Sequence, residues 1–139
     1  AYAWRMAARA ARPPLAGRVA WCGALSDAAL AVEMAAAHVM VVPSDYEGFG
    51  IVYLEGMGFG LPAMATTSGA AAELITDGVD GYLVAPGDTV ALAERIAALA
   101  DDRVRLAQMS AAARARFAGW PTWDDSCAAI HSFLLDIIG

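Results

Sequence analysis

Short apolar runs alternate with longer periodic segments along most of the chain. Buried strands are predicted from four runs that Gly, Pro or polar residues bound: residues 18–23, 38–42, 61–66 and 82–84. Helices are predicted where apolar residues recur at helical spacing: residues 27–37, 51–58, 70–75, 88–100, 101–118 and 122 onward. Because no hairpin turn joins the strands, the pattern indicates an α/β protein with a parallel, doubly wound (Rossmann-like) sheet and helices on both faces.

Polar residues mark the predicted helix starts. Ser26 or Asp27 caps one helix, and Asp88 caps another. Thr122 followed by Asp125 resembles a capping box, with the shorter Asp in place of Glu or Gln. Residues 1–12 are expected to form a helix remnant or a frayed terminus that ends at two prolines.

Two polar turns, residues 43–50 and 66–70, each follow a predicted strand and precede a predicted helix. In a doubly wound sheet, ligands bind beyond the carboxyl ends of the strands, so both turns belong to the binding edge. Glu47 lies in the first turn, followed by the flexible positions Gly48 and Gly50, and Glu55 lies in the following helix. Two separated carboxylates suit a ligand with separated hydroxyl pairs, such as a sugar nucleotide.

Composition excludes several classes of protein. The chain of 139 residues is at most one domain, and its mean hydropathy of +0.49 raises the question of a membrane span. The longest charge-free segment, residues 56–72, is interrupted by Gly, Pro, Thr and Ser, so we expect no transmembrane segment. The net charge of −6 argues against a nucleic-acid partner.

The cysteines and histidines do not form a pattern typical of a disulfide framework or a metal site. Cys22 and Cys127 make no disulfide framework, and Cys22 falls in a predicted strand, so we expect a cytoplasmic location. Peripheral association of a longer protein with a membrane remains an alternative. His38 and His131 lack ligand spacing, so no metal is expected. The glycines at 56, 58 and 60 end a helix and do not follow a strand, which argues against a dinucleotide fingerprint.

The chain resembles the donor-binding, C-terminal domain of retaining GT-B glycosyltransferases, the glycosyl transferases group 1 of family 4. The resemblance covers nearly everything from residue 18 onward. Two motifs carry it: P-S-x-x-E-G-F-G-x-x-x-L-E-G-M-x-x-G-L-P from residue 43 and S-G-x-x-x-E-x-I-x-D-G-x-x-G-Y-L-V-x-P-G-D from residue 68.

This resemblance implies a role for each residue of the first motif. Glu47 would bind hydroxyls of the transferred sugar and act near the anomeric carbon as the catalytic carboxylate, while Glu55 would bind the nucleotide ribose. Ionised carboxylates accept strong hydrogen bonds from hydroxyl pairs. Gly48, Phe49 and Gly50 would offer backbone N–H groups to the donor at a helix start.

Three further residues complete the predicted donor site. Ser44 either reaches the ligand or closes the turn, and the sequence leaves both interpretations open. Ser68 and Gly69 occupy the position of a Gly-Gly pair in the family, with Ala70 after them. The ligand implied is a nucleotide sugar of the UDP, GDP or ADP type, without cofactor or metal.

The family also has parts that this chain lacks. An N-terminal domain binds the carbohydrate, lipid or small-molecule acceptor, and an Arg and a Lys grip the donor diphosphate. All nine basic residues here are arginines, so that pair is absent. We expect residues 1–139 to form a single incomplete domain, inactive alone, whose segment 119–139 packs toward the missing domain. The alternatives are a non-catalytic glycosyltransferase-like module or a GT-B sugar-nucleotide epimerase.

Overall fold

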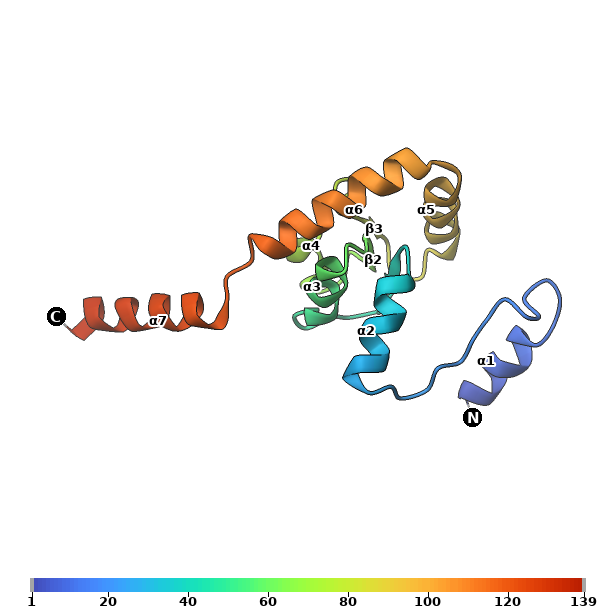
Figure 1. The fold of residues 1–139 in the computed structure, drawn as a ribbon, viewed down its shortest axis with the longest axis horizontal. Coiled ribbons are helices and arrows are strands. Elements are labelled where there is room, and N and C mark those ends of the chain that lie inside the picture. The colour runs from blue at the N-terminus through green and yellow to red at the C-terminus, as the bar shows by residue number, and fades with distance from the viewer. Residues whose placement is uncertain (1, 139) are drawn as a thin grey trace. The chain divides into compact units, whose positions relative to one another are not determined.

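The computed structural model describes residues 2–138, and the chain divides into two compact units, residues 1–33 and 34–139. The first unit holds helix α1 (Tyr2–Ala10) and most of α2 (Asp27–Ala36), which crosses the boundary. Ser26 starts α2, because its hydroxyl accepts a hydrogen bond from the Ala29 N–H at 3.4 Å. All three described strands belong to the second unit (Figure 1).

The three strands form one parallel sheet in the order β1 (Met40–Val42), β2 (Ala63–Thr66) and β3 (Gly81–Val84). Val41 pairs with Met64, which in turn pairs with Tyr82. All four residues of β2 are buried, as expected for a central strand that helices cover on both faces. The predicted parallel α/β architecture is therefore confirmed.

The helices of the second unit follow the predicted order. They are α3 (Ile51–Gly58), α4 (Ala71–Leu74), α5 (Thr89–Asp101), α6 (Arg103–Ala118) and α7 (Trp123–Ile138). Asp88 caps α5 by accepting a hydrogen bond from the Ala91 N–H at 2.9 Å. Thr122 and Asp125 form the predicted capping box, since each side chain accepts a hydrogen bond from the backbone N–H of the other.

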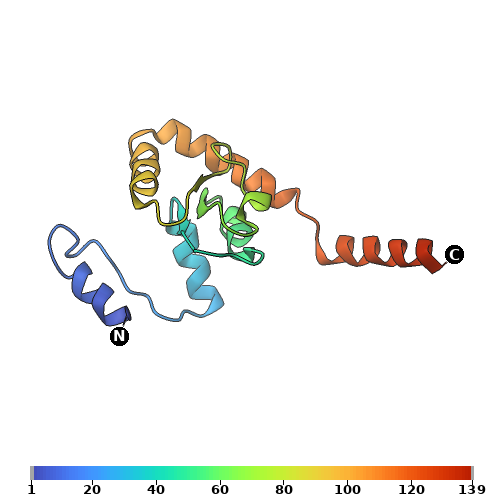
Figure 2. The same ribbon diagram turned by 180° about the vertical axis from the view of Figure 1, so that it is seen from behind.

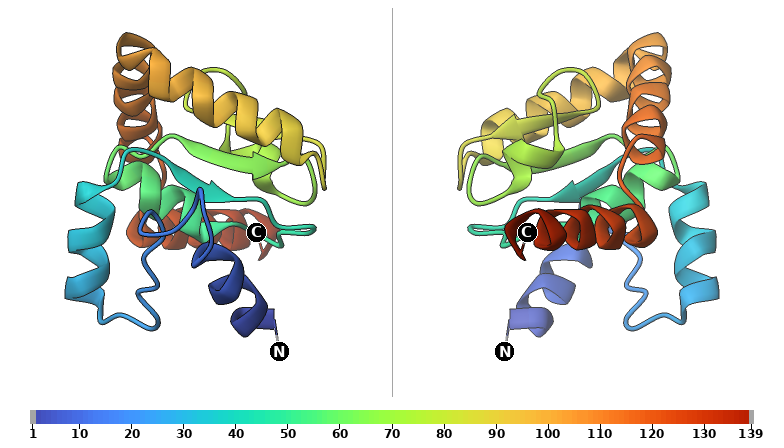
Figure 3. Two further views of the ribbon diagram at one scale, coloured as in Figure 1. Left: turned by 90° about the vertical axis from the view of Figure 1, so that its right-hand side faces the viewer. Right: turned by 90° about the vertical axis from the view of Figure 1, so that its left-hand side faces the viewer.

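The two faces of the sheet have separate apolar cores. Ala63 and Ala65 of β2 pack with residues of α3 and α4 on one face. Met64, which lies between them in the strand, packs with Leu99 of α5 and with residues of α6 on the other face. This alternation follows from the two-residue period of a strand. Figures 1, 2 and 3 accordingly show α3 and α5 on opposite sides of the strands.

Helix α6 runs along the amino edge of the sheet and bonds to segments that precede the strands. Arg114 donates a hydrogen bond to the carbonyl of Phe59, before β2, at 3.1 Å. Arg105 donates to the Gly78 carbonyl, before β3. Arg116 forms an ion pair of 3.0 Å with Asp80, which is 2% exposed. Arginines of α6 therefore hold the turns at this edge.

The strand predicted at residues 18–23 is wrong. This segment is irregular and exposed, and no described strand pairs with it. A strand needs a neighbour for its backbone N–H and C=O groups, and an apolar run cannot form a sheet edge alone. Cys22 is consequently an exposed free cysteine, as is Cys127.

Helix α7 has no buried residue. Large apolar side chains along it are exposed, among them Phe133 at 64% and Ile137 at 65%. The predicted packing of segment 119–139 on a further domain stays a prediction. Among residues 2–138, no helix combines the length and apolar character that crossing a membrane requires.

Candidate functional site

The two polar turns lie together at the carboxyl edge of the sheet, as the sequence predicts. The Ala70 N–H, in the turn after β2, donates a hydrogen bond to the Glu47 carbonyl, in the turn after β1, at 3.0 Å. The Thr66 hydroxyl donates to the Ser44 carbonyl at 2.6 Å and accepts from the Ser68 N–H at 3.4 Å. Backbone carbonyls of the first turn thus fix the second turn against it.

Gly69 makes this close approach of the two turns possible. Its φ of +71° is a conformation that side chains rarely adopt, and a Cβ there would overlap the Glu47 carbonyl oxygen. The fold alone therefore requires glycine at 69, whatever the ligand. Ser44 closes the turn through its carbonyl, so contact of its side chain with a ligand remains a prediction.

Gly50 shapes the start of α3. It is the N-cap residue with φ +82°, and a Cβ there would lie 2.6 Å from the ring of Tyr53 and 3.2 Å from Cγ of Glu47. No side chain caps this helix start. The Tyr53 N–H donates to the Gly50 carbonyl at 2.9 Å, and the N–H groups of Ile51 and Val52 are left for solvent or for an anionic ligand, as at other helix N-termini.

Gly48 differs from its neighbour because the fold does not require it. A Cβ at 48 would meet no heavy atom within 4 Å, and its φ is outside the left-handed region. The next residue, Phe49, is 53% exposed. Open space at Gly48 and an exposed ring beside it are features that a bound ligand would use.

Glu47 lies beside the buried phenol of Tyr53. The Tyr53 ring is 1% exposed, and its hydroxyl donates to the Val42 carbonyl at 3.2 Å. Burial, and secondarily the negative charge of Glu47, raise the pKa of Tyr53 above its ordinary value of 10.0. Glu47 is half-buried, whereas Glu55 is exposed on the middle of α3. The two predicted carboxylates therefore differ in environment.

A small cavity of about 120 Å³ opens at the same edge, between the ends of the strands and the start of α5. Asp45, Thr66 and Asp88 are among its lining residues, and none of the predicted donor-binding residues lines it. Sequence reasoning missed Thr66 and Tyr53, which position the turns. Their signal was weak, because a strand-end Thr and a helical Tyr are both ordinary core residues.

The described residues 2–138 include no cluster of three or more His, Cys, Asp or Glu side chains placed to hold a metal ion. The site consists of turn backbone, an uncapped helix start and two carboxylates. The parallel sheet with helices on both faces places the chain in the class of doubly wound α/β domains.

The chain belongs to the family described as glycosyl transferases group 1, which it matches over residues 3–102. It is 39% identical over 119 residues to sucrose synthase of Acidithiobacillus caldus, covering 79% of this chain and 15% of the relative. The chain thus spans about a seventh of that relative's length.

Two solved glycosyltransferase structures share the fold. Sucrose-phosphate synthase from Thermosynechococcus elongatus has a TM-score of 0.84 and 29% identity, over 97% of this chain and 34% of that one. HepE from Anabaena, solved in complex with UDP-glucose, has a TM-score of 0.76 and 32% identity, over 84% of this chain and 32% of that one. The architecture is that of the C-terminal half of a GT-B glycosyltransferase.

Proposed function

We propose that the carboxyl edge is the donor-binding part of a retaining glycosyltransferase that uses a nucleotide sugar. The observation that carries this proposal is the hydrogen bond from Ala70, in turn 66–70, to the Glu47 carbonyl. It accompanies a carboxylate, a helix start without a side-chain cap and open space at Gly48 in the same turn. The complex of HepE with UDP-glucose supports a donor of this type, with GDP and ADP donors as alternatives.

Each carboxylate has its own part in the proposal. Glu47 accepts hydrogen bonds from sugar hydroxyls and stabilises positive charge that develops at the anomeric carbon. Glu55 accepts hydrogen bonds from the ribose. Hydrogen bonds to charged groups contribute about 1.5–3 kcal/mol, which corresponds to roughly 10- to 150-fold in affinity or rate.

The donor diphosphate needs a further source of positive charge. The sequence has no lysine, and neither polar turn contains an arginine. Backbone N–H groups at the start of α3 offer only partial charges. We therefore expect the 139-residue chain alone to bind donor weakly and to transfer no sugar, and we place acceptor recognition outside it.

The test compares Glu47→Gln and Glu55→Gln with Glu94→Gln in the complete protein that contains this chain. Glu94 is exposed on α5, so its variant controls for loss of one negative charge. Glu47→Gln should lower kcat/KM about 100-fold, and Glu55→Gln should weaken donor binding about tenfold in calorimetry. Unchanged kinetics in both variants would disprove the assignment.

The products test the remaining parts of the proposal. NMR of the product should show the anomeric configuration of the donor, and a chelator should leave the rate unchanged. An isomerised nucleotide sugar without transfer would identify an epimerase. Donor binding without any turnover would identify a non-catalytic module.

A further inference from the structure

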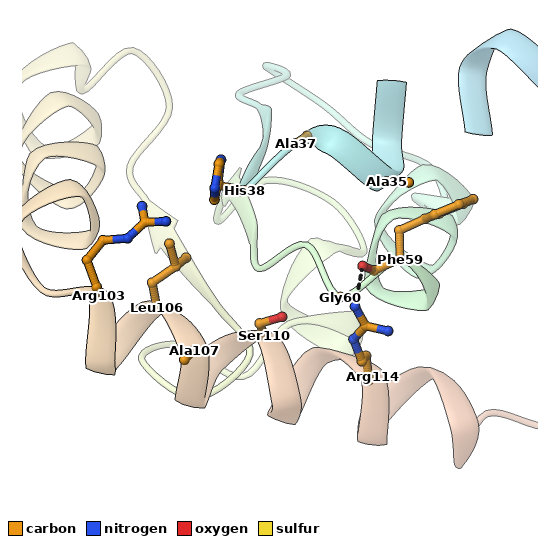
Figure 4. A pocket seen from close by; sticks show the side chains of 10 residues that line it. All are labelled: Ala35, Ala37, His38, Phe59, Gly60, Arg103, Leu106, Ala107, Ser110 and Arg114. Carbon is orange, nitrogen blue, oxygen red and sulfur yellow. Dashed lines mark hydrogen bonds between the residues drawn. The ribbon is translucent and has the colours of Figure 1, made fainter. Parts of the chain in front are cut away.

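A second cavity lies at the amino edge of the sheet, opposite the two polar turns. It has a volume of about 230 Å³ and lies between α6, the end of α2, the segment before β1 and the turn before β2 (Figure 4). One stripe of α6 forms a wall, since its lining residues follow helical spacing: Arg103, Leu106, Ala107, Ser110 and Arg114. We call this cavity the α6 groove.

Basic side chains stand at the two ends of the α6 groove. Arg103 and His38 lie at one end, and Arg114 lies at the other, beside Gly60 (Figure 4). No carboxylate is among the ten lining residues, although the chain has 15 acidic residues against nine arginines. The ion pair between Arg116 and Asp80 is the only one found among residues 2–138. The guanidinium groups of Arg103 and Arg114 thus form no ion pair with an acidic side chain within the described residues.

Arg103 differs from the other arginines of α6. Arg105, Arg114 and Arg116 each donate hydrogen bonds to turns of the fold, whereas Arg103 makes no side-chain hydrogen bond to any residue from 2 to 138. It also occupies the first turn of α6, where a positive charge opposes the helix dipole. Arg103 is exposed, and its guanidinium is free of the bonds that hold the other three arginines of α6 to turns of the fold.

The dimensions of the α6 groove limit its ligand. Arg103 and Arg114 are separated by eleven residues, which is about 16 Å along a helix, and both side chains are long enough to reach inward. The volume is below the roughly 300–1,000 Å³ of pockets that hold drug-sized ligands. Leu106 and Ala107 form an apolar wall between the charged ends, with the Ser110 hydroxyl as a polar group.

We propose that the α6 groove binds a small, elongated organic anion with acidic groups at both ends, such as a sugar bisphosphate. One acidic group pairs with Arg103 beside His38, and the other pairs with Arg114. Guanidinium groups bind phosphate and carboxylate through paired N–H donors, and Arg114 keeps four of its five N–H donors after bonding Phe59. The α6 groove is separate from the proposed donor site, because it lies at the opposite edge of the sheet.

Calorimetric titration of the full chain tests the two-ended geometry with three probes: fructose 1,6-bisphosphate, fructose 6-phosphate and inorganic phosphate. The bisphosphate should bind at least tenfold more tightly than either single-ended probe. Amide NMR signals of α6, including Arg103 and Ser110, should shift on binding, while those of Glu47 should not. Equal affinity for all three probes would overturn the proposal, as would shifts confined to the carboxyl edge.

Variants identify the residues that bind the probes. Arg103→Gln should remove the advantage of the bisphosphate and leave the fold intact, because the exposed Arg103 side chain makes no hydrogen bond or ion pair recorded among residues 2–138. Arg114→Gln should do the same with some loss of stability. Arg18→Gln, which removes an exposed arginine outside the groove, is the charge-matched control and should bind like the unaltered protein. Full bisphosphate affinity in Arg103→Gln would refute the site.

Discussion

The two edges of the sheet are built by different means. At the carboxyl edge, hydrogen bonds to backbone carbonyls hold the turns together, and the Glu47 side chain makes no hydrogen bond recorded among residues 2–138. At the amino edge, three arginine side chains of α6 bond to the turns. The side chain of the fourth, Arg103, makes no hydrogen bond recorded among residues 2–138. Side chains that make no bond within the fold, such as those of Glu47 and Arg103, are therefore the candidates for binding that the two edges offer.

The largest effect should come from breaking the contact between the turns at the carboxyl edge. Gly69→Ala would force a Cβ into the Glu47 carbonyl at a left-handed φ, so we expect a loss of about 3 kcal/mol in the free energy of unfolding. Urea denaturation measures it. Gly87→Ala is the matched control, because Gly87 has a φ of +76° and open space around it. A loss of only about 1 kcal/mol is expected there, and equal losses in the two variants would disprove the close contact.

At the amino edge, Asp80→Ala should lower the free energy of unfolding by about 2 kcal/mol. The buried carboxylate accepts hydrogen bonds from the Thr76 N–H at 2.8 Å and from Arg116, and both donors would lose their partner. Arg103→Gln should change stability by less than about 0.5 kcal/mol. Thermal or urea unfolding measures both variants. Similar losses of stability would contradict the assignment of a structural role to Asp80 and of none to Arg103.

Gly48→Ala separates binding from folding at the carboxyl edge. The added Cβ meets no protein atom, so we expect stability to change by less than about 0.5 kcal/mol. Donor affinity of the complete protein should fall about tenfold, because the methyl group occupies space assigned to the ligand. Calorimetry with the donor measures the change. Unaltered affinity would remove Gly48 from the proposed site.

Thr66→Val tests the side chain that links the turns. Loss of the hydroxyl leaves the Ser44 carbonyl and the Ser68 N–H without this partner, and a destabilisation of about 1 kcal/mol is expected. Hydrogen exchange of the Ala70 amide should become faster, because its acceptor in the first turn is held less firmly. Unchanged exchange at Ala70 would show that the backbone bond is sufficient by itself.

The smallest effect concerns the titration of Tyr53. The folded protein holds the phenol proton more tightly than the unfolded chain does, because the pKa is raised above 10.0. The resulting stability is present below pH 10.0 and is lost as the pH rises through the folded pKa. Glu47→Gln should lower this pKa only in part, since burial is the larger cause. Absorbance of the phenolate measures the pKa of Tyr53. An unchanged pKa in Glu47→Gln would show that the charge of Glu47 does not act on Tyr53.

Much of this architecture could be predicted from local sequence. The helix starts at Asp88 and Thr122 could be predicted, because capping needs residues only three positions apart. The binding edge followed from the order of strands and polar turns. The strand at 18–23 could not be judged in this way, since strand formation depends on a distant partner.

The contacts that hold the site were beyond sequence reasoning for a related reason. The bond from Ala70 to Glu47 joins backbone atoms, and any residue type supplies those. Arg116 lies 36 positions from Asp80, and arginines on a helix usually face solvent. The α6 groove required the turn before β2 to be placed against α6, which no spacing along the chain indicates.

The small side chains of the central strand have a consequence for the packing of α3. Ala63 and Ala65 are 0% exposed and face the core that includes residues of α3. Their methyl groups set the spacing between helix and sheet, because a close-packed interior leaves no room for larger side chains. The Glu47 turn leads directly into α3, and a valine at 65 would press against the core that α3 and α4 share. Two small side chains inside the core thereby determine how closely α3 approaches the sheet.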